Sequence, residues 1–285
     1  DASVKKMLED AGFTDTESIV TSKNTYVAPF VNAEEAQYLV IENAFPNGRP
    51  ALENAGVMFT SRETVEKVER MKVCTCLNPL HTALAVYGCL LGYTKISDEM
   101  KDADLVKLVE IIGYKEGLPV VTDPGILSPK KFIDEVLQIR VPNPFMPDTP
   151  QRIACDTSQK LSIRFGETIK EYMASSELDV KSLKFIPMVQ AGWCRYLLGV
   201  DDELNAFTVS PDPMYEELAG KLAGVKVGES CDVHAVLSPI LSDAKIFGVN
   251  LYEAGLGEYV ESIFAELIAG KGAVRETLKR HLAEA

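Results

Sequence analysis

The sequence predicts a mainly α-helical protein with a small β segment near its N-terminal end. Residues that cap helices recur ahead of apolar stretches from about residue 60 onward. Strand-forming β-branched and aromatic residues gather only between residues 19 and 42. With 285 residues, of which 46% are hydrophobic, the chain is long enough to bury a sizeable core.

The N-terminal segment is expected to contain a short helix from Ser3 to Gly12, followed by two or three strands between residues 19 and 42. The next stretch, AFPNGRPALENAG at residues 44–56, is rich in turn-forming residues. We therefore divide the chain into a β-containing segment, residues 1–58, and a helical domain, residues 59–285.

The helical domain is expected to open at Thr60, which has the spacing of a capping box with Glu63 and starts a helix through VEKVERMKV. Pro79 suits the first turn of a second helix, which would end near Gly92. Further helices are expected over residues 97–116, 128–140, 149–173, 184–198, 213–223, 231–241, 256–269 and 272–284.

Composition argues against several kinds of partner. The chain has 29 basic and 42 acidic residues and a net charge of −13, which disfavours nucleic acid or an anionic membrane as a partner. The longest nearly uncharged stretch, His81 to Tyr93, is shorter than the roughly 20 apolar residues that span a membrane. Six cysteines without a regular spacing suit a reducing compartment, so we expect a cytoplasmic protein.

The stretch MKVCTCLNPLHTALAVYG, residues 71–88, concentrates polar and ionisable residues ahead of an apolar helix. It lacks the four ligands and the spacing of a zinc site, so no metal is expected. Cys74 and Cys76 have apolar neighbours and are expected to be buried and inert. Taken alone, Lys72, Asn78 and His81 could be a solvated lysine, a helix cap and a satisfied ring, or they could form an active site.

A longer stretch around this motif, VERMKVCTCLNPLHTALAVYGCLLGY, resembles the signature of the mannitol dehydrogenase family, the polyol-specific long-chain dehydrogenases. Three other stretches resemble the same family in the same order: LVIENAFPNGRPALENAGV (39–57), NPFMPDTPQRIACDTSQKLSIRF (143–165) and AGWCRYLLGVDD (191–202).

The resemblance implies a fold with two domains. The family has an N-terminal Rossmann domain that binds NAD or NADP, and a multi-helical C-terminal domain, like that of 6-phosphogluconate dehydrogenase, that supplies the catalytic residues. This sequence has no G-x-G-x-x-G after a strand and does not begin with Met. We therefore expect it to be the C-terminal domain, to act with the Rossmann domain of the same polypeptide, and to be inactive alone.

The resemblance also implies roles for four residues of the motif. Lys72 matches the family's catalytic base, and burial would favour its neutral, basic form. Asn78 and His81 match residues that hydrogen-bond the reacting oxygen. Glu69 matches a glutamate that passes the proton to water, although a surface ion pair with Lys72 is an equally good interpretation.

The spacing of the motif departs from the family. Five residues, VCTCL, separate Lys72 from Asn78, where the family usually has four. One additional residue rotates two positions on an α-helix by about 100° relative to each other. A π turn or a break before Pro79 is needed if both side chains are to face one substrate.

Arg152 and Lys160 match the family's substrate-binding positions, and the DTSQK and AGWCRY stretches favour a member that acts on a sugar acid over one that acts on a polyol. With Asp156 they are spaced to lie on one face of a long helix, which is also the pattern of a solvated salt-bridge ladder. Two further alternatives stay open: a non-catalytic helical interaction module that keeps the family fold, and an enzyme built on an exposed, reactive Cys74 or Cys76.

Overall fold

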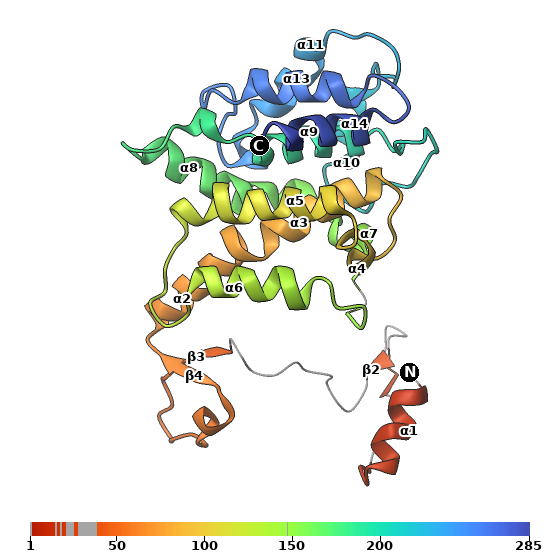
Figure 1. Cartoon of the computed structure of the whole chain (residues 1–285). Helices are drawn as coiled ribbons and strands as arrows, with labels where there is room; N and C mark the ends of the chain where they lie inside the picture. The colour runs from red at the N-terminus through yellow and green to blue at the C-terminus, as the bar shows by residue number, and fades with distance from the viewer. Residues whose placement is uncertain (1, 15, 18, 21–25, 28–38, 147) are drawn as a thin grey trace. The chain divides into compact units, whose positions relative to one another are not determined.

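A computed structural model describes residues 2–14, 16–17, 19–20, 26–27, 39–146 and 148–285. Contacts between residues divide the chain into two units, Asp1–Phe59 and Thr60–Ala285. The first unit is small and contains short strands, and the second is almost entirely helical (Figure 1). The prediction of a mainly helical fold is confirmed.

The first unit contains helix α1 (Ala2–Asp10) and two small sheets. Strands β1 (Ile19–Val20) and β2 (Tyr26–Val27) pair in antiparallel register. Strand β3 (Val40–Glu42) pairs with β4 (Met58–Thr60). The other residues of the expected strand region, 21–25 and 28–38, lie outside the described residues.

Thr60 was expected to start the first helix of the second unit, and this is wrong. It ends β4, and Ser61 caps the helix by accepting a hydrogen bond from the Thr64 N–H at 3.3 Å. Helix α2 (Arg62–Met71) then passes directly into a π-helical turn, η2 (Lys72–Cys76). After a bend at Leu77, helix α3 (Asn78–Leu90) begins.

The two helices predicted over residues 97–116 and 149–173 are both interrupted. The first divides into α4 (Ile96–Glu99) and α5 (Ala103–Glu110), because Asp102 caps a new helix through the Asp104 N–H. The second divides at Asp156, whose φ of 52° is left-handed. The pieces are α7 (Pro150–Ile153), a 3₁₀ turn η6 (Thr157–Gln159), a π turn η7 (Ser162–Gly166) and α8 (Glu167–Ala174).

The remaining predicted helices are confirmed to within a few residues, and one short helix, α12, was not predicted. The confirmed helices are α6 (Pro129–Glu135) with the π turn η5 (Val136–Arg140), α9 (Phe185–Tyr196), α10 (Tyr215–Leu222), α11 (Val233–Leu241), α13 (Gly257–Leu267) and α14 (Ala273–Ala283). The unpredicted helix α12 spans Ala244–Phe247. The π turn η3 (Ile111–Gly117) extends α5.

The core of the helical unit lies around α3 and α9. Helix α13 packs on α9, and α9 packs on α3, so that these helices form successive layers in Figure 1. Every residue of α9 is buried, including Trp193, whose ring meets Phe247 edge-on. Buried Arg195 donates hydrogen bonds to the carbonyls of Leu267, Val200 and Asp201, so its role is structural.

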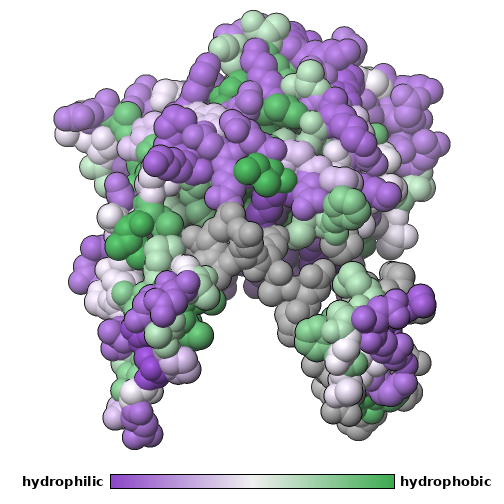
Figure 2. All heavy atoms as spheres, turned by 60° about the horizontal axis from the view of Figure 1, so that its bottom comes forward, coloured by the Kyte–Doolittle hydropathy of each residue, from purple (hydrophilic) through white to green (hydrophobic). Residues whose placement is uncertain are grey.

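The helical run Arg62–Leu90 is long and apolar enough, by length and composition, to cross a membrane. Because η2 joins α2 to α3, this run is longer than the uncharged stretch of the sequence suggested. However, 83% of its most apolar window is buried within the protein, as expected for a central core helix. Hydrophilic side chains cover most of the visible face of the helical unit in Figure 2.

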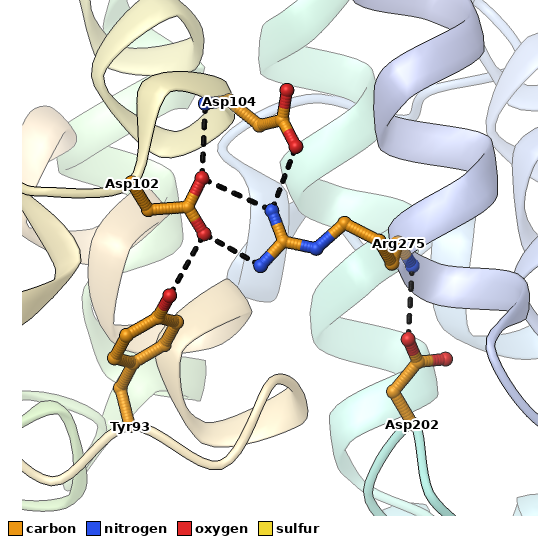
Figure 3. A network of polar contacts seen from close by, with 5 residues as sticks. All are labelled: Tyr93, Asp102, Asp104, Asp202 and Arg275. Atoms are coloured by element: carbon orange, nitrogen blue, oxygen red, sulfur yellow. Dashed lines mark hydrogen bonds and ion pairs between the residues drawn. The ribbon is translucent and has the colours of Figure 1, made fainter.

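A polar network ties the C-terminal helix to the rest of the helical unit (Figure 3). The Arg275 guanidinium, at the start of α14, donates hydrogen bonds to both oxygens of Asp102 and to Asp104 at 2.8 Å. The Tyr93 hydroxyl donates a further hydrogen bond to Asp102 at 2.9 Å. The carboxylate of Asp202 meanwhile accepts the backbone N–H of Val274 and of Arg275, which caps α14.

Candidate active site

Asn78 and His81 lie one turn apart at the start of α3, so their side chains point from the same face of the helix. Both are half-buried. The cap position is Leu77, and no side chain caps this helix end, which rules out Asn78 as an ordinary N-cap. Among the described residues, neither the Asn78 amide nor the His81 ring has a side-chain hydrogen-bond partner. Both remain available to a ligand.

The π turn η2 absorbs the additional residue between Lys72 and Asn78. The Lys72 carbonyl accepts the Leu77 N–H at 3.1 Å, a bond that spans five residues where an α-helix spans four. Together with the bend at Leu77, this turn is the departure from α geometry that the spacing required. Lys72 itself is half-buried at the start of the turn.

His81 is held in its neutral form. Burial, followed by the positive charges of Arg164 and Arg152, lowers the pKa of His81 to about 4. A neutral imidazole carries one N–H donor and one bare nitrogen acceptor. At neutral pH it therefore offers a hydrogen bond to a substrate oxygen without adding a positive charge.

Three cations approach this face of α3 from the segment 152–164, and we call Arg152, Lys160 and Arg164 the basic cluster. Helix α7, which carries Arg152, packs directly against α3. Arg164 donates a hydrogen bond from Nη1 to Thr82 Oγ1 at 2.7 Å. Lys160 is close enough to Arg164 that burial and the Arg164 charge together lower the pKa of its ammonium group.

The predicted helical stripe of Arg152, Asp156 and Lys160 is wrong, because the left-handed Asp156 ends the helical register between them. The chain turns there because the Asp156 N–H bonds the Pro211 carbonyl at 2.8 Å. Asp212 fixes the next residue by accepting hydrogen bonds from the backbone N–H and hydroxyl of Ser158. A loop far along the chain thus sets where Lys160 lies.

The members of the basic cluster differ in how their charge is compensated. Arg152 is exposed and forms an ion pair with Asp148. Lys160 is half-buried and donates a hydrogen bond to the Cys155 carbonyl, with the charges of Asp156 and Asp212 nearby. For Arg164, the structure records the hydrogen bond to Thr82 and no ion pair with any described residue.

Glu69 lies on α2 one turn before Lys72, and it is exposed. No ion pair joins its carboxylate to a lysine or arginine within the part of the chain that the structure describes. The interpretation of Glu69 and Lys72 as a surface ion pair therefore has no support in the structure.

The cysteines of the motif are unsuited to thiol chemistry. Cys74 and Cys76 are buried, and burial raises the pKa of the Cys76 thiol to about 12. Burial also raises the pKa of Cys74. Because a reactive cysteine needs an accessible thiolate, these two are structural. The described residues contain no group of three His, Cys, Asp or Glu side chains placed to hold a metal ion.

The described residues form a small cavity next to His81. The cavity there is about 10 Å³ and is lined by His81, Ile96, Arg140, Val141, Met146 and Asp148. That volume holds about one water molecule. The described residues also lack a parallel sheet and a glycine-rich turn between a strand and a helix, so they do not fit a dinucleotide pyrophosphate.

Residues 64–264 match the family model described as the mannitol dehydrogenase C-terminal domain. The chain belongs to the mannitol dehydrogenase family. It is 60% identical to the D-mannonate oxidoreductase of Thermotoga maritima over 97% of this chain and 51% of that protein. It is 30% identical to the D-mannonate oxidoreductase of Escherichia coli over 66% of this chain and 37% of that protein.

Two solved structures have a similar fold. The Pseudomonas fluorescens mannitol 2-dehydrogenase, in a ternary complex with NAD and D-mannitol, matches with a TM-score of 0.73 and 25% identity, over all of this chain and 52% of that one. A D-sorbitol dehydrogenase in substrate-free form matches with a TM-score of 0.68 and 26% identity, over 82% and 45% of the two chains. The chain spans about half the length of the curated relatives it matches.

Within the family fold, the structure brings together Asn78, His81 and the basic cluster, and it places Lys72 one π turn before Asn78. Arg164 was not predicted from the sequence, although a signal was present. Arg164 follows Lys160 by four residues and lies in the IRF that ends a family-like stretch. The interruption at Asp156 made the helical spacing of that stretch misleading.

Proposed function

We propose that this chain is the catalytic and substrate-binding domain of an NAD-dependent D-mannonate oxidoreductase, which interconverts D-mannonate and NAD with D-fructuronate and NADH. The identity of 60% to the Thermotoga maritima D-mannonate oxidoreductase over 97% of the chain carries this proposal. A basic cluster in a protein of net charge −13 supports an anionic sugar acid as the substrate.

In the proposed reaction, NAD would supply the hydride-accepting chemistry. We assign its binding to an N-terminal Rossmann domain of the same polypeptide, and NADP stays an alternative. The residues of this chain handle the proton and position the sugar. The cavity at His81 is about 10 Å³, too small for a sugar. We therefore propose that the second domain completes the sugar pocket.

Lys72 would act as the general base, accepting the hydroxyl proton of the alcohol and returning it when the ketone is reduced. Asn78 and neutral His81 would hydrogen-bond the same oxygen and stabilise charge that develops on it. Glu69, exposed one turn before Lys72, would pass the proton to water. Arg152 and Lys160 would bind the rest of the sugar acid.

Mannitol 2-dehydrogenase activity is the second candidate. The likeness to the Pseudomonas fluorescens mannitol 2-dehydrogenase, with a TM-score of 0.73, favours it. The two candidates differ in whether the substrate carries a carboxylate, so a comparison of D-fructuronate with D-fructose separates them. A non-catalytic helical interaction module would reduce neither sugar.

The test is NADH oxidation by the complete gene product with D-fructuronate and D-fructose, for the wild type and for Lys72→Ala. We expect a preference for D-fructuronate and a loss of at least about 100-fold in kcat for the variant, the scale of a lost general base. The 285-residue chain alone is expected to show no turnover. Turnover of D-fructose in preference to D-fructuronate would favour the second candidate, and full activity of Lys72→Ala would contradict the assigned base.

We further propose a cytoplasmic location. All six cysteines are free thiols, as in proteins of a reducing compartment. Fractionation of cells that express the complete gene product tests this proposal.

A further inference from the structure

Arg164 lies at the edge of the candidate site and finds no counter-ion among the described residues. It is half-buried, and burial lowers the pKa of its guanidinium to about 10. No carboxylate forms an ion pair with it among the described residues. Removing a charged group from water without a partner is costly, so such a cation normally has either a structural partner or a ligand.

A hydrogen bond to α3, the helix that carries Asn78 and His81, fixes the position of the Arg164 guanidinium. Arg164 Nη1 donates to Thr82 Oγ1 at 2.7 Å, and the Thr82 hydroxyl in turn donates to the Asn78 carbonyl at 2.8 Å. This chain of hydrogen bonds fixes Arg164 relative to Asn78 and to His81, the neighbour of Thr82. The positive charge of Arg164 reaches the His81 ring, as the lowered pKa of His81 indicates.

The Arg164 hydrogen bond to Thr82 uses one of five guanidinium N–H groups. Nε and Nη2 have no hydrogen-bond partner among the described residues, and they are not sealed off from solvent. A guanidinium edge with two parallel N–H groups matches the two oxygens of a carboxylate. By contrast, Asp148 already pairs with Arg152, and the Cys155 carbonyl already accepts from Lys160.

We infer that Arg164 is the carboxylate receptor of this site and the residue that makes the enzyme select a sugar acid over the corresponding neutral sugar. This inference rests on the proposed function and names a determinant for it. His81 and Asn78 would hold the reacting oxygen, and Arg164 would hold the carboxylate at the far end of the same carbon chain. The acid then supplies the counter-ion that the described residues do not provide for Arg164.

The experiment compares the complete gene product with its Arg164→Gln and Arg164→Lys variants, and measures kcat/KM for D-fructuronate and for D-fructose with NADH. We expect Arg164→Gln to lower kcat/KM for D-fructuronate by about 100-fold, mainly through KM, the effect of a lost charged hydrogen bond pair. For D-fructose we expect a change of less than about threefold. Arg164→Lys keeps the charge without the fork and should recover part of the discrimination.

Two control variants separate binding from architecture. Thr82→Val removes the hydrogen-bond partner of Arg164 and leaves its charge, so discrimination should fall less than in Arg164→Gln. Lys170→Gln removes an exposed charge from α8 and should leave discrimination unchanged. Equal losses for both sugars in Arg164→Gln and Arg164→Lys would show a structural role, and unchanged kinetics would show no contact with the substrate. Either result overturns the inference.

A binding measurement keeps this inference separate from the proposed function. If the wild type reduces neither sugar, the proposed function fails, and calorimetric binding of D-mannonate and D-mannitol then decides the role of Arg164. Binding of D-mannonate that is tighter than that of D-mannitol, and that is lost in Arg164→Gln, supports a carboxylate site. Equal binding of the two compounds, or an absence of binding, contradicts it.

Discussion

At the scale of single residues, the motif from Lys72 to His81 could be found from sequence because its order resembles a family signature. Its chemical state could not, because that depends on neighbours far along the chain. His81 is neutral owing to burial and to Arg164 and Arg152, more than 70 residues away in sequence. Arg164 was missed for the same reason, since its partner Thr82 lies 82 positions earlier.

Glu99, at the end of α4, is a buried carboxyl group whose ionisation opposes folding. It is 0% exposed, and neither carboxyl oxygen has a hydrogen-bond partner among the described residues. Burial, and then the negative charge of Asp102, raises the pKa of Glu99 to about 9. In the unfolded chain a glutamate has a pKa of about 4.3. At a pH between these two pKa values, unfolding releases a proton from Glu99. The contribution of Glu99 to stability is therefore fully present below about pH 4.3 and is lost as the pH rises towards 9.

We predict that Glu99→Gln removes this pH dependence. The free energy of unfolding of the variant, relative to the wild type, should increase from pH 5 to pH 8, with a limiting slope of about 1.4 kcal/mol per pH unit. Urea denaturation of both proteins at the two pH values measures the difference. A difference that is the same at pH 5 and pH 8 would mean that Glu99 titrates normally in the folded state.

At the scale of elements, capping residues and prolines predicted where most helices begin, because those signals are local. Ser128 before α6 and Thr149 before α7 both cap as expected. Interruptions within helices were not predicted at Met100–Asp102 or at Asp156, where distant segments supply the partners. The π turn η2 was anticipated as one of two solutions, because the family spacing made the additional residue visible.

We predict that the hydrogen bonds between Arg275 and Asp102 stabilise the packing of α14. Asp102→Asn keeps an oxygen to cap α5 but removes the charge that binds Arg275, and it should lower the free energy of unfolding by about 1–3 kcal/mol. Asp98→Asn is the matched control on α4, because Asp98 forms an exposed ion pair with Lys101. That control should cost less than about 1 kcal/mol. Thermal denaturation of the two variants compares them, and equal losses would contradict a structural role for the network.

At the scale of the whole chain, helix-capping residues ahead of apolar stretches predicted the mainly helical fold. Four short stretches in the same order as in known members predicted the family. The chain matches about half the length of its curated relatives, as expected for one of two domains. A helical domain without a parallel sheet among its described residues suits the proposed function, in which a second domain binds the cofactor. The site would then be completed by the domain that binds the cofactor.

The most direct test of this account is a crystal structure of the complete gene product with D-mannonate and oxidised cofactor. We predict that the reacting hydroxyl lies within hydrogen-bonding distance of Lys72, Asn78 and His81, and that the carboxylate lies on the free edge of Arg164. A sugar bound elsewhere, or one whose reacting carbon faces away from His81, would contradict the proposed active site.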